Sequence, residues 1–84
     1  YEGVKQRLLV ELREHEPSDL DGIPVTRVQP LTTNDGAKFF TADGSWLLVR
    51  TSGTEPLVRV YTEASSAELR DALIAAGERL VRGE

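Results

Sequence analysis

The sequence predicts one α+β domain in which a four-stranded, mainly antiparallel sheet carries two helices packed on one face. The length of 84 residues is room for a single domain, which should span residues 1–84. Apolar residues recur at helical spacing near both ends of the chain. Between these ends lie four short apolar stretches separated by turn-forming residues, the pattern of an antiparallel meander. Helices over one face of such a sheet are typical of the α+β class.

The first and the last elements are the predicted helices. Residues 4–14 carry valine or leucine at every fourth position with charged residues between them, which predicts an amphipathic helix. Pro17 and the polar residues after it end this helix. The second helix repeats its apolar residues at spacings of four, three and four, at Leu69, Leu73, Ala76 and Leu80. Ser65, followed three residues later by Glu68, has the pattern of a capping box and should fix the start of this helix.

Four strands are expected between the helices, at residues 25–31, 37–41, 45–50 and 57–63. Residues 33–36 end in Asp-Gly and predict a tight hairpin turn, and residues 42–44 predict a second turn. The strand at residues 45–50 is apolar on both faces, as expected for a central strand. In the last strand, Arg59 should lie on the same face as Tyr61, where two roles are open: additional charge near the site, or the surface role that we expect.

Composition excludes several classes of function. The net charge of −4 argues against nucleic-acid binding, which relies on a basic face. No apolar run is long enough to span a membrane, and no signal peptide is recognisable. The absence of cysteine removes disulfides and thiolate metal sites and fits the cytoplasm. The chain starts at Tyr1 rather than at Met, so we expect it to be part of a longer protein.

The segment at residues 50–56 connects the third and fourth expected strands and is suited to an anion. Ser52 and Thr54 offer hydroxyl donors, and a glycine between them lets successive backbone N–H groups converge. Arg50 has a planar guanidinium that matches two phosphate oxygens at once. Serine, glycine and threonine are also common in ordinary turns, where a neighbouring arginine faces solvent. Spacing alone leaves both interpretations open.

Residues 44–61 read Gly-Ser-Trp-Leu-Leu-Val-Arg-Thr-Ser-Gly-Thr-Glu-Pro-Leu-Val-Arg-Val-Tyr. This run closely resembles the signature of the final domain of the α-D-phosphohexomutases, the phosphoglucomutase/phosphomannomutase family. The family pattern is Asp-Gly, an apolar strand, Arg-(Pro/Thr)-Ser-Gly-Thr-Glu-Pro, then another strand. Residues 35–38, Asp-Gly-Ala-Lys, also match the upstream Asp-Gly-x-Lys segment of the family. The resemblance covers about residues 22–63 and implies a TATA-box-binding-protein-like fold.

The resemblance also implies which residues form the site. The ligands of the substrate phosphate are expected at Arg50, Ser52, Gly53 (through its backbone) and Thr54. Thr51 and Glu55 are expected to support them. No catalytic residue is expected in this chain, because the phosphorylated serine of the family lies in its first domain, in a motif that is absent here. No metal site is expected either, since Asp19 and Asp21 supply too few carboxylates for a hard cation.

The family's full enzymes have four domains around one cleft. The resemblance implies a parent enzyme that interconverts hexose 1-phosphate and 6-phosphate through a bisphosphorylated sugar, with Mg²⁺ bound outside this chain. Expected partners are the hexose phosphate substrate and the other domains of the same polypeptide, with no nucleic acid and no membrane. The isolated chain should be inactive. Sugar choice is expected to lie mainly in the third domain.

Three alternatives remain open at this stage. In the first, the parent enzyme is a phosphoglucosamine mutase, whose final domain shares the loop. The chain is a stand-alone sugar-phosphate-binding module. Lastly, it is an interaction domain in which residues 50–56 are only a turn.

Overall fold

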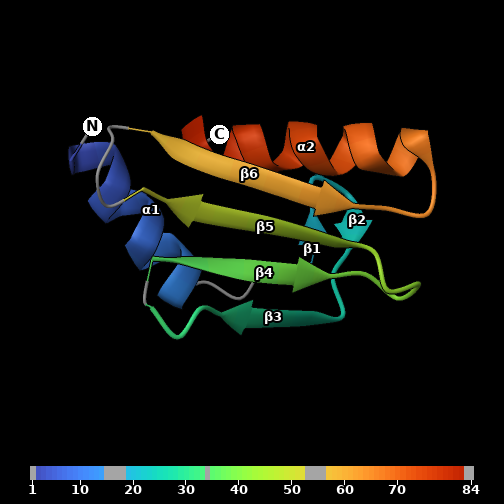
Figure 1. Cartoon of the computed structure of the whole chain (residues 1–84), viewed down its shortest axis with the longest axis horizontal. Coiled ribbons are helices and arrows are strands. Elements are labelled where there is room, and N and C mark those ends of the chain that lie inside the picture. Colours follow the sequence, from blue (N-terminus) through green and yellow to red (C-terminus); the bar gives the residue numbers. More distant parts are fainter. Residues whose placement is uncertain (1, 15–18, 34, 53–56, 83–84) are drawn as a thin grey trace.

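A computed structural model describes residues 2–14, 19–33, 35–52 and 57–82. Within these ranges the chain forms two helices and six strands, in the order α1 (Glu2–Glu14), β1 (Asp19–Leu20), β2 (Ile23–Pro24), β3 (Arg27–Pro30), β4 (Gly36–Phe40), β5 (Trp46–Thr51), β6 (Val58–Glu63) and α2 (Ala67–Arg82). Neither described helix is long and apolar enough to cross a membrane. The predicted α+β class is confirmed (Figure 1).

The main sheet is an antiparallel meander in the order β3-β4-β5-β6. Each strand pairs with the one before it in the sequence, and β5 is central, between β4 and β6. The pairing register places Val49 opposite both Ala37 and Val60, so apolar side chains of three strands share one face. This register confirms the predicted strand order.

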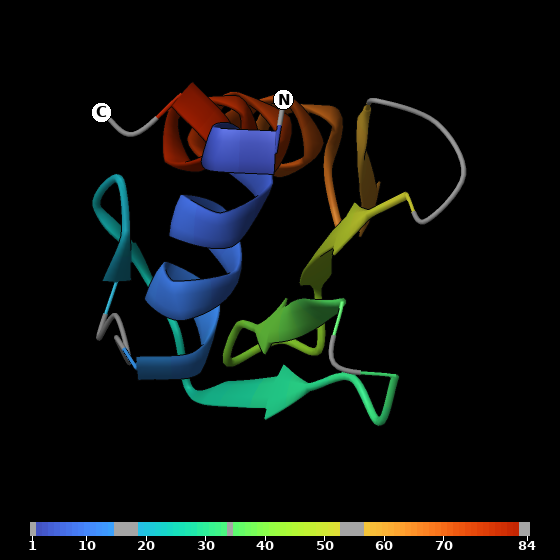
Figure 2. The same cartoon turned by 90° about the vertical axis from the view of Figure 1, so that its left-hand side faces the viewer.

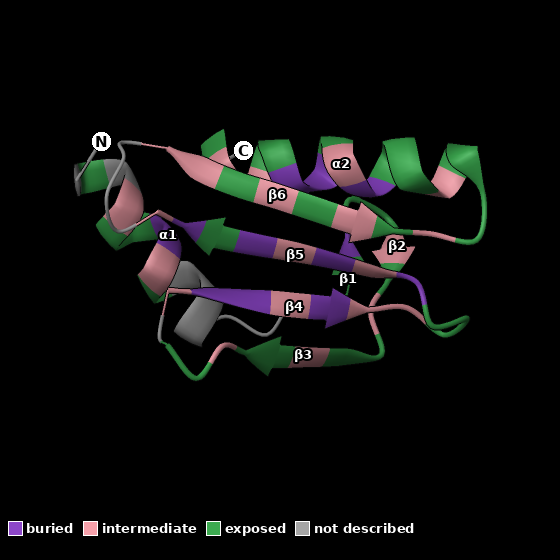
Figure 3. Cartoon of the chain, viewed as in Figure 1, coloured by how far each residue is buried: buried purple, intermediate pink, exposed green. Residues whose placement is uncertain are grey.

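Both helices cover the same face of the sheet (Figure 2). The strands alternate between buried and more exposed residues, and the buried positions of β4 and β5 lie in one layer with the inner side of α2 (Figure 3). The core consists of Leu8, Leu20, Ala37, Phe39, Leu47, Val49, Leu73 and Ala76. Burial of each large side chain in this set stabilises the fold by about 1.5–3 kcal/mol. At the end of α2, the Arg7 Nη2 group donates to the carbonyl oxygen of Val81 and so connects the two helices.

The outer face of the sheet is covered by cations rather than by a second apolar layer. Trp46 and Leu48 are only half-buried there, although their strand is central. The Lys38 ammonium lies 4.2 Å from the centroid of the Trp46 ring. The Arg27 guanidinium lies 4.4 Å from the centroid of the Phe40 ring. Such contacts let the long aliphatic stems shield aromatic surface while the charges stay in water.

A short hairpin, β1–β2, precedes the sheet and was not anticipated. Asp21 and Gly22 form its two-residue turn, with φ angles of 53° and 89°. Two consecutive positive φ angles are the hallmark of a type I′ turn, which Asp-Gly favours. Leu20 is buried in the core, and an ion pair of 3.6 Å joins Asp21 to Arg79 of α2. The residues on both sides of this turn pair as short antiparallel strands.

The start of α2 differs by one residue from the prediction. The backbone N–H of Leu69 donates to Ser66 Oγ at 3.1 Å, which makes Ser66 the N-cap. The Ser65 hydroxyl instead donates to Asp43 Oδ2 at 2.6 Å. The capping box of Ser65 and Glu68 is therefore wrong, because Ser65 is engaged by the turn between β4 and β5.

Asp43 fastens that turn to the beginning of α2. Its carboxylate accepts hydrogen bonds from Ser65 Oγ, from Thr41 Oγ1 at 2.6 Å and from the backbone N–H of Ser45 at 3.0 Å. These bonds, from Ser65 first and then from Thr41 and Ser45, hold the pKa of Asp43 far below its ordinary value. One carboxylate thereby links two connections that lie 22 residues apart in the sequence.

We expect Asp43→Asn to lower the melting temperature at neutral pH and to matter less in acid. Because the folded-state pKa is lowered, Asp43 stabilises the fold above the ordinary aspartate pKa of about 3.9. That contribution is lost as the pH falls through the lower folded-state pKa. Thermal unfolding of the wild-type chain and the variant, from neutral pH to about pH 2, should show two curves that converge. Asp71→Asn, which neutralises an exposed carboxylate on α2, is the control. Parallel curves for the Asp43 variant would contradict the assignment.

Candidate functional site

The predicted loop begins at the end of β5. Arg50 and Thr51 are the last residues of the strand, and Ser52 follows directly. The backbone N–H of Ser52 donates to the carbonyl oxygen of Leu57 at 3.1 Å, which brings the two sides of the connection together next to β6. The predicted residues Gly53, Thr54 and Glu55 lie outside the described residues.

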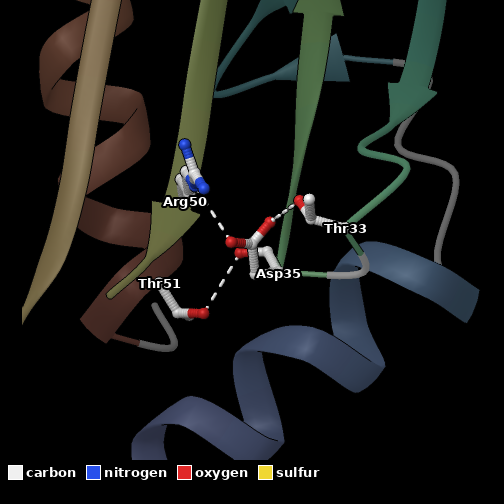
Figure 4. Close-up of polar contacts among 4 residues, drawn as sticks. All are labelled: Thr33, Asp35, Arg50 and Thr51. Carbon is white, nitrogen blue, oxygen red and sulfur yellow. Dashed lines mark hydrogen bonds and ion pairs between the residues drawn. The ribbon is translucent and has the colours of Figure 1, made fainter. Parts of the chain in front are cut away.

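Arg50 stands on the outer face of the sheet with half of its side-chain surface exposed. Its Nε–H group donates to Asp35 Oδ2 at 2.9 Å (Figure 4). The structure gives its two Nη groups no hydrogen bond to the described residues. The guanidinium is thus held by one edge, while the edge that forms two-point contacts with oxyanions stays available.

Asp35 is the residue around which the site is arranged (Figure 4). Its Oδ1 atom accepts a hydrogen bond from the Thr33 hydroxyl, and its Oδ2 atom accepts the bond from Arg50. Partial burial raises the pKa of Asp35, but the hydrogen bonds from Thr33 and Arg50 and the positive charge of Arg50 outweigh burial and hold that pKa below its ordinary value. Asp35 therefore stays ionised at neutral pH.

Thr51 fixes the backbone of Asp35. Its N–H group and its hydroxyl both donate to the Asp35 carbonyl oxygen, at 2.8 Å and 3.1 Å. The Thr51 side chain is buried, with 1% of its surface exposed. Arg50 and Thr51 point to opposite faces of β5, so one contacts the carboxylate of Asp35 and the other its backbone carbonyl oxygen.

Gly36 sets how closely Asp35 approaches β5. It is the first residue of β4 and pairs with Arg50, so the predicted hairpin connection between β3 and β4 is confirmed, but its last residue belongs to the strand. A Cβ atom on Gly36 would lie 2.1 Å from the carbonyl oxygen of Val49 and 2.9 Å from the Cα atom of Arg50. Only glycine leaves room for this backbone approach. In this Asp-Gly pair the glycine therefore serves strand pairing, and the aspartate ends the connection between β3 and β4.

Arg59 adds a second guanidinium to the same surface. It lies directly opposite Arg50 in the register of β5 and β6 and is exposed on the outer face. Side chains in such a pair have Cβ atoms about 4.5–5.5 Å apart, and like charges placed opposite each other repel. The alternation of residues 57–63 placed Arg59 on the face of Tyr61, and the strand register shows that this position lies beside Arg50.

The described part of the site offers positive charge and hydrogen-bond donors to an anion. No group of three or more His, Cys, Asp or Glu side chains lies together among the described residues in a way that could hold a metal ion.

The fold and the strand-end arginine define a small α+β domain with a polar loop at one end of an antiparallel meander. The sequence profile of the phosphoglucomutase/phosphomannomutase C-terminal domain matches residues 8–80. The chain therefore belongs to this family of mutase domains, as the resemblance indicated.

Curated relatives agree with this assignment. A phosphoglucomutase/phosphomannomutase from Thermococcus kodakarensis is 43% identical over 51 residues, which are 61% of this chain and 11% of that protein. A phosphopentomutase from the same organism is 42% identical over 48 residues, or 57% of this chain and 11% of that protein. A phosphoglucosamine mutase from Methanococcus aeolicus is 48% identical over 50 residues, or 60% of this chain and 11% of that protein. The chain thus spans about a tenth of the length of these relatives.

We expect Gly36→Ala to destabilise the domain by about 1–3 kcal/mol, because the added methyl group must push β4 away from the backbone of β5. Thermal or urea unfolding of the chain measures this loss. Gly3→Ala is the matched control, since a Cβ atom at Gly3 meets no atom within 4 Å. The control should be neutral or slightly stabilising in helix α1. Equal unfolding curves for the two variants would show that the close approach at Gly36 is not a constraint.

Proposed function

We propose that this chain holds the phosphate group of a sugar phosphate in a phosphohexomutase, with Arg50, Ser52, the backbone of Gly53 and Thr54 as ligands. The observation that supports this most is the geometry of Arg50. Its guanidinium is exposed at the end of a rigid strand, and Asp35 holds it by Nε alone. Its two Nη groups have no hydrogen bond to the described residues, and their planar geometry suits two phosphate oxygens.

The names of the relatives support recognition of phosphate rather than of the sugar. They act, by name, on hexose, pentose and hexosamine phosphates, yet their matching segments are 42–48% identical to this chain. The phosphate is the group that these substrates share. A domain that grips the phosphate is therefore compatible with different sugars, whose choice we assign to other domains of the enzyme.

The proposed parent enzyme interconverts hexose 1-phosphate and 6-phosphate through a bisphosphorylated intermediate. Its phosphoserine and its Mg²⁺ site are assigned to other domains of the same polypeptide, and its location to the cytoplasm. Phosphoryl transfer depends largely on positioning and on stabilisation of charge. Binding energy from the phosphate that does not react offsets the cost of orienting the one that does. The isolated chain is accordingly proposed to bind but not to catalyse.

A phosphoglucosamine mutase is the second candidate. Two curated relatives with this name, from Methanococcus aeolicus and Methanocaldococcus jannaschii, are 48% and 44% identical over 50 residues each. Assays of the full-length protein with glucose 1-phosphate, mannose 1-phosphate and glucosamine 1-phosphate distinguish these substrates.

Arg50→Lys in the full-length protein should reduce kcat/KM far more than it reduces stability. Lysine keeps the charge but replaces the planar two-point contact by a single ammonium. Loss of one charge-assisted hydrogen bond costs about 1.5–3 kcal/mol, which is about ten- to more than a hundredfold in kcat/KM. The fold should lose no more than about 0.5–1 kcal/mol, since Arg50 is half exposed.

Arg70→Lys provides the matched control for this experiment. Arg70 is exposed to a similar extent and also pairs with an aspartate, Asp71, but it lies on helix α2. Steady-state kinetics and thermal melts on both variants test the assignment. Wild-type turnover by Arg50→Lys, or an activity loss that merely follows a large drop in melting temperature, would count against a phosphate-binding role.

The isolated chain should bind phosphate weakly, with a Kd in the millimolar range or above, equivalent to about 4 kcal/mol or less. A single loop supplies few ligands, and the rest of the proposed cleft is missing. Titration of the ¹⁵N-labelled chain with glucose 6-phosphate, followed by NMR, measures this affinity. Binding below one micromolar would show instead that the chain is a complete sugar-phosphate-binding module.

A further inference from the structure

We infer that Asp35 is a positioning residue for the anion site, which holds Arg50 in its binding geometry with help from Thr33. This inference rests on the proposed function, because it concerns how the phosphate ligand Arg50 is oriented. Three observations carry it: the ion pair between Asp35 and Arg50, the hydrogen bond from Thr33, and the fixation of the Asp35 backbone by Thr51 (Figure 4).

The two oxygens of the Asp35 carboxylate have separate partners. Oδ1 accepts from Thr33, and Oδ2 accepts from Arg50 Nε at 2.9 Å. The Thr33 bond fixes the rotation of the carboxylate, which then fixes the plane of the guanidinium. Three quarters of the Asp35 side chain is shielded from solvent, since its exposed fraction is 25%. Asp35 is thus a shielded anchor for a more exposed arginine.

The backbone of Asp35 is also held in place. Its carbonyl oxygen accepts both the N–H group and the hydroxyl of Thr51. Gly36, the next residue, pairs with Arg50 and allows β4 to approach β5. The anchor and the arginine are therefore parts of one rigid strand pair, and the Arg50 side chain loses part of its freedom before any ligand arrives. Preorganisation of this kind favours binding because less side-chain ordering remains for the ligand to impose.

Positioning and simple electrostatics predict opposite effects for the loss of Asp35. A carboxylate near a bound phosphate repels it, so removal of that charge alone should strengthen binding. If Asp35 positions Arg50, its removal should weaken binding despite the lost repulsion. We expect Asp35→Asn and Asp35→Ala to weaken phosphate binding by about two- to tenfold, the range that corresponds to ordering one long side chain.

The experiment titrates inorganic phosphate into the ¹⁵N-labelled chain at constant ionic strength. It records the affinity from backbone amide shifts and the state of Arg50 from its Nε–H resonance. In the wild type this resonance should be sharp and shifted, because the group donates to Asp35. In Asp35→Ala it should move toward the position of a solvated arginine before phosphate is added. Thr33→Val removes a hydrogen bond without changing the charge and should weaken binding by about twofold or more.

Asp71→Asn is the matched control, since it removes an exposed carboxylate beside Arg70 without touching the site. It should leave phosphate affinity unchanged. Weaker binding by the Asp35 and Thr33 variants with an altered Arg50 resonance supports the inference. Tighter or unchanged binding by the Asp35 variants, or an unchanged Arg50 resonance, overturns it. Arg50→Lys in the same titration distinguishes a failure of the proposed function from a failure of the positioning role. Unaltered phosphate affinity of Arg50→Lys refutes the proposed function itself. Weaker binding by Arg50→Lys, with unchanged binding by the Asp35 variants, refutes only the positioning role.

Discussion

The pairing of β4 with β5 supports both the core and the candidate site. On the inner face, Ala37 and Phe39 of β4 lie beside Leu47 and Val49 of β5 and form the layer that the helices cover. At the end of the same pair, Asp35 meets Arg50 and Thr51. The approach of the two backbones at Gly36 sets both arrangements. A shift of β4 by one residue would turn its core side chains toward solvent and move Asp35 away from Arg50.

The order of helices and strands followed from periodicity, but the roles of individual turn residues did not. The chain contains three Asp-Gly pairs, at residues 21–22, 35–36 and 43–44. The first forms a type I′ hairpin turn, the second opens strand β4, and the third lies in the turn between β4 and β5. The local preference of Asp-Gly is the same in all three places. Whether an Asp-Gly pair forms a turn or part of a strand is decided by its contacts with distant strands. These contacts depend on strand register rather than on local sequence.

The same distinction applies to the site and to the start of α2. Arg50 and Ser52 could be singled out because their chemistry and spacing are local. Asp35 was assigned only to a turn and to a family motif, since nothing in its neighbourhood shows that it meets an arginine 15 residues later. Ser65 and Ser66 are equally good N-caps by residue type. Asp43, which engages Ser65 from across the fold, leaves Ser66 to cap the helix.

The meander topology has a consequence for how the site forms. Asp35, Arg50 and Thr51 lie within one β4–β5 hairpin, whose connection is the short turn at residues 42–44. Contacts of such short sequence separation require less loop-closure entropy than contacts between the ends of the chain. The contact between the two ends of the chain closes a much longer loop, since Arg7 of α1 and Val81 of α2 are 74 residues apart in the sequence. The contacts among Asp35, Arg50 and Thr51 therefore depend on the β4–β5 hairpin alone, whereas the contact between the helices requires both ends of the chain.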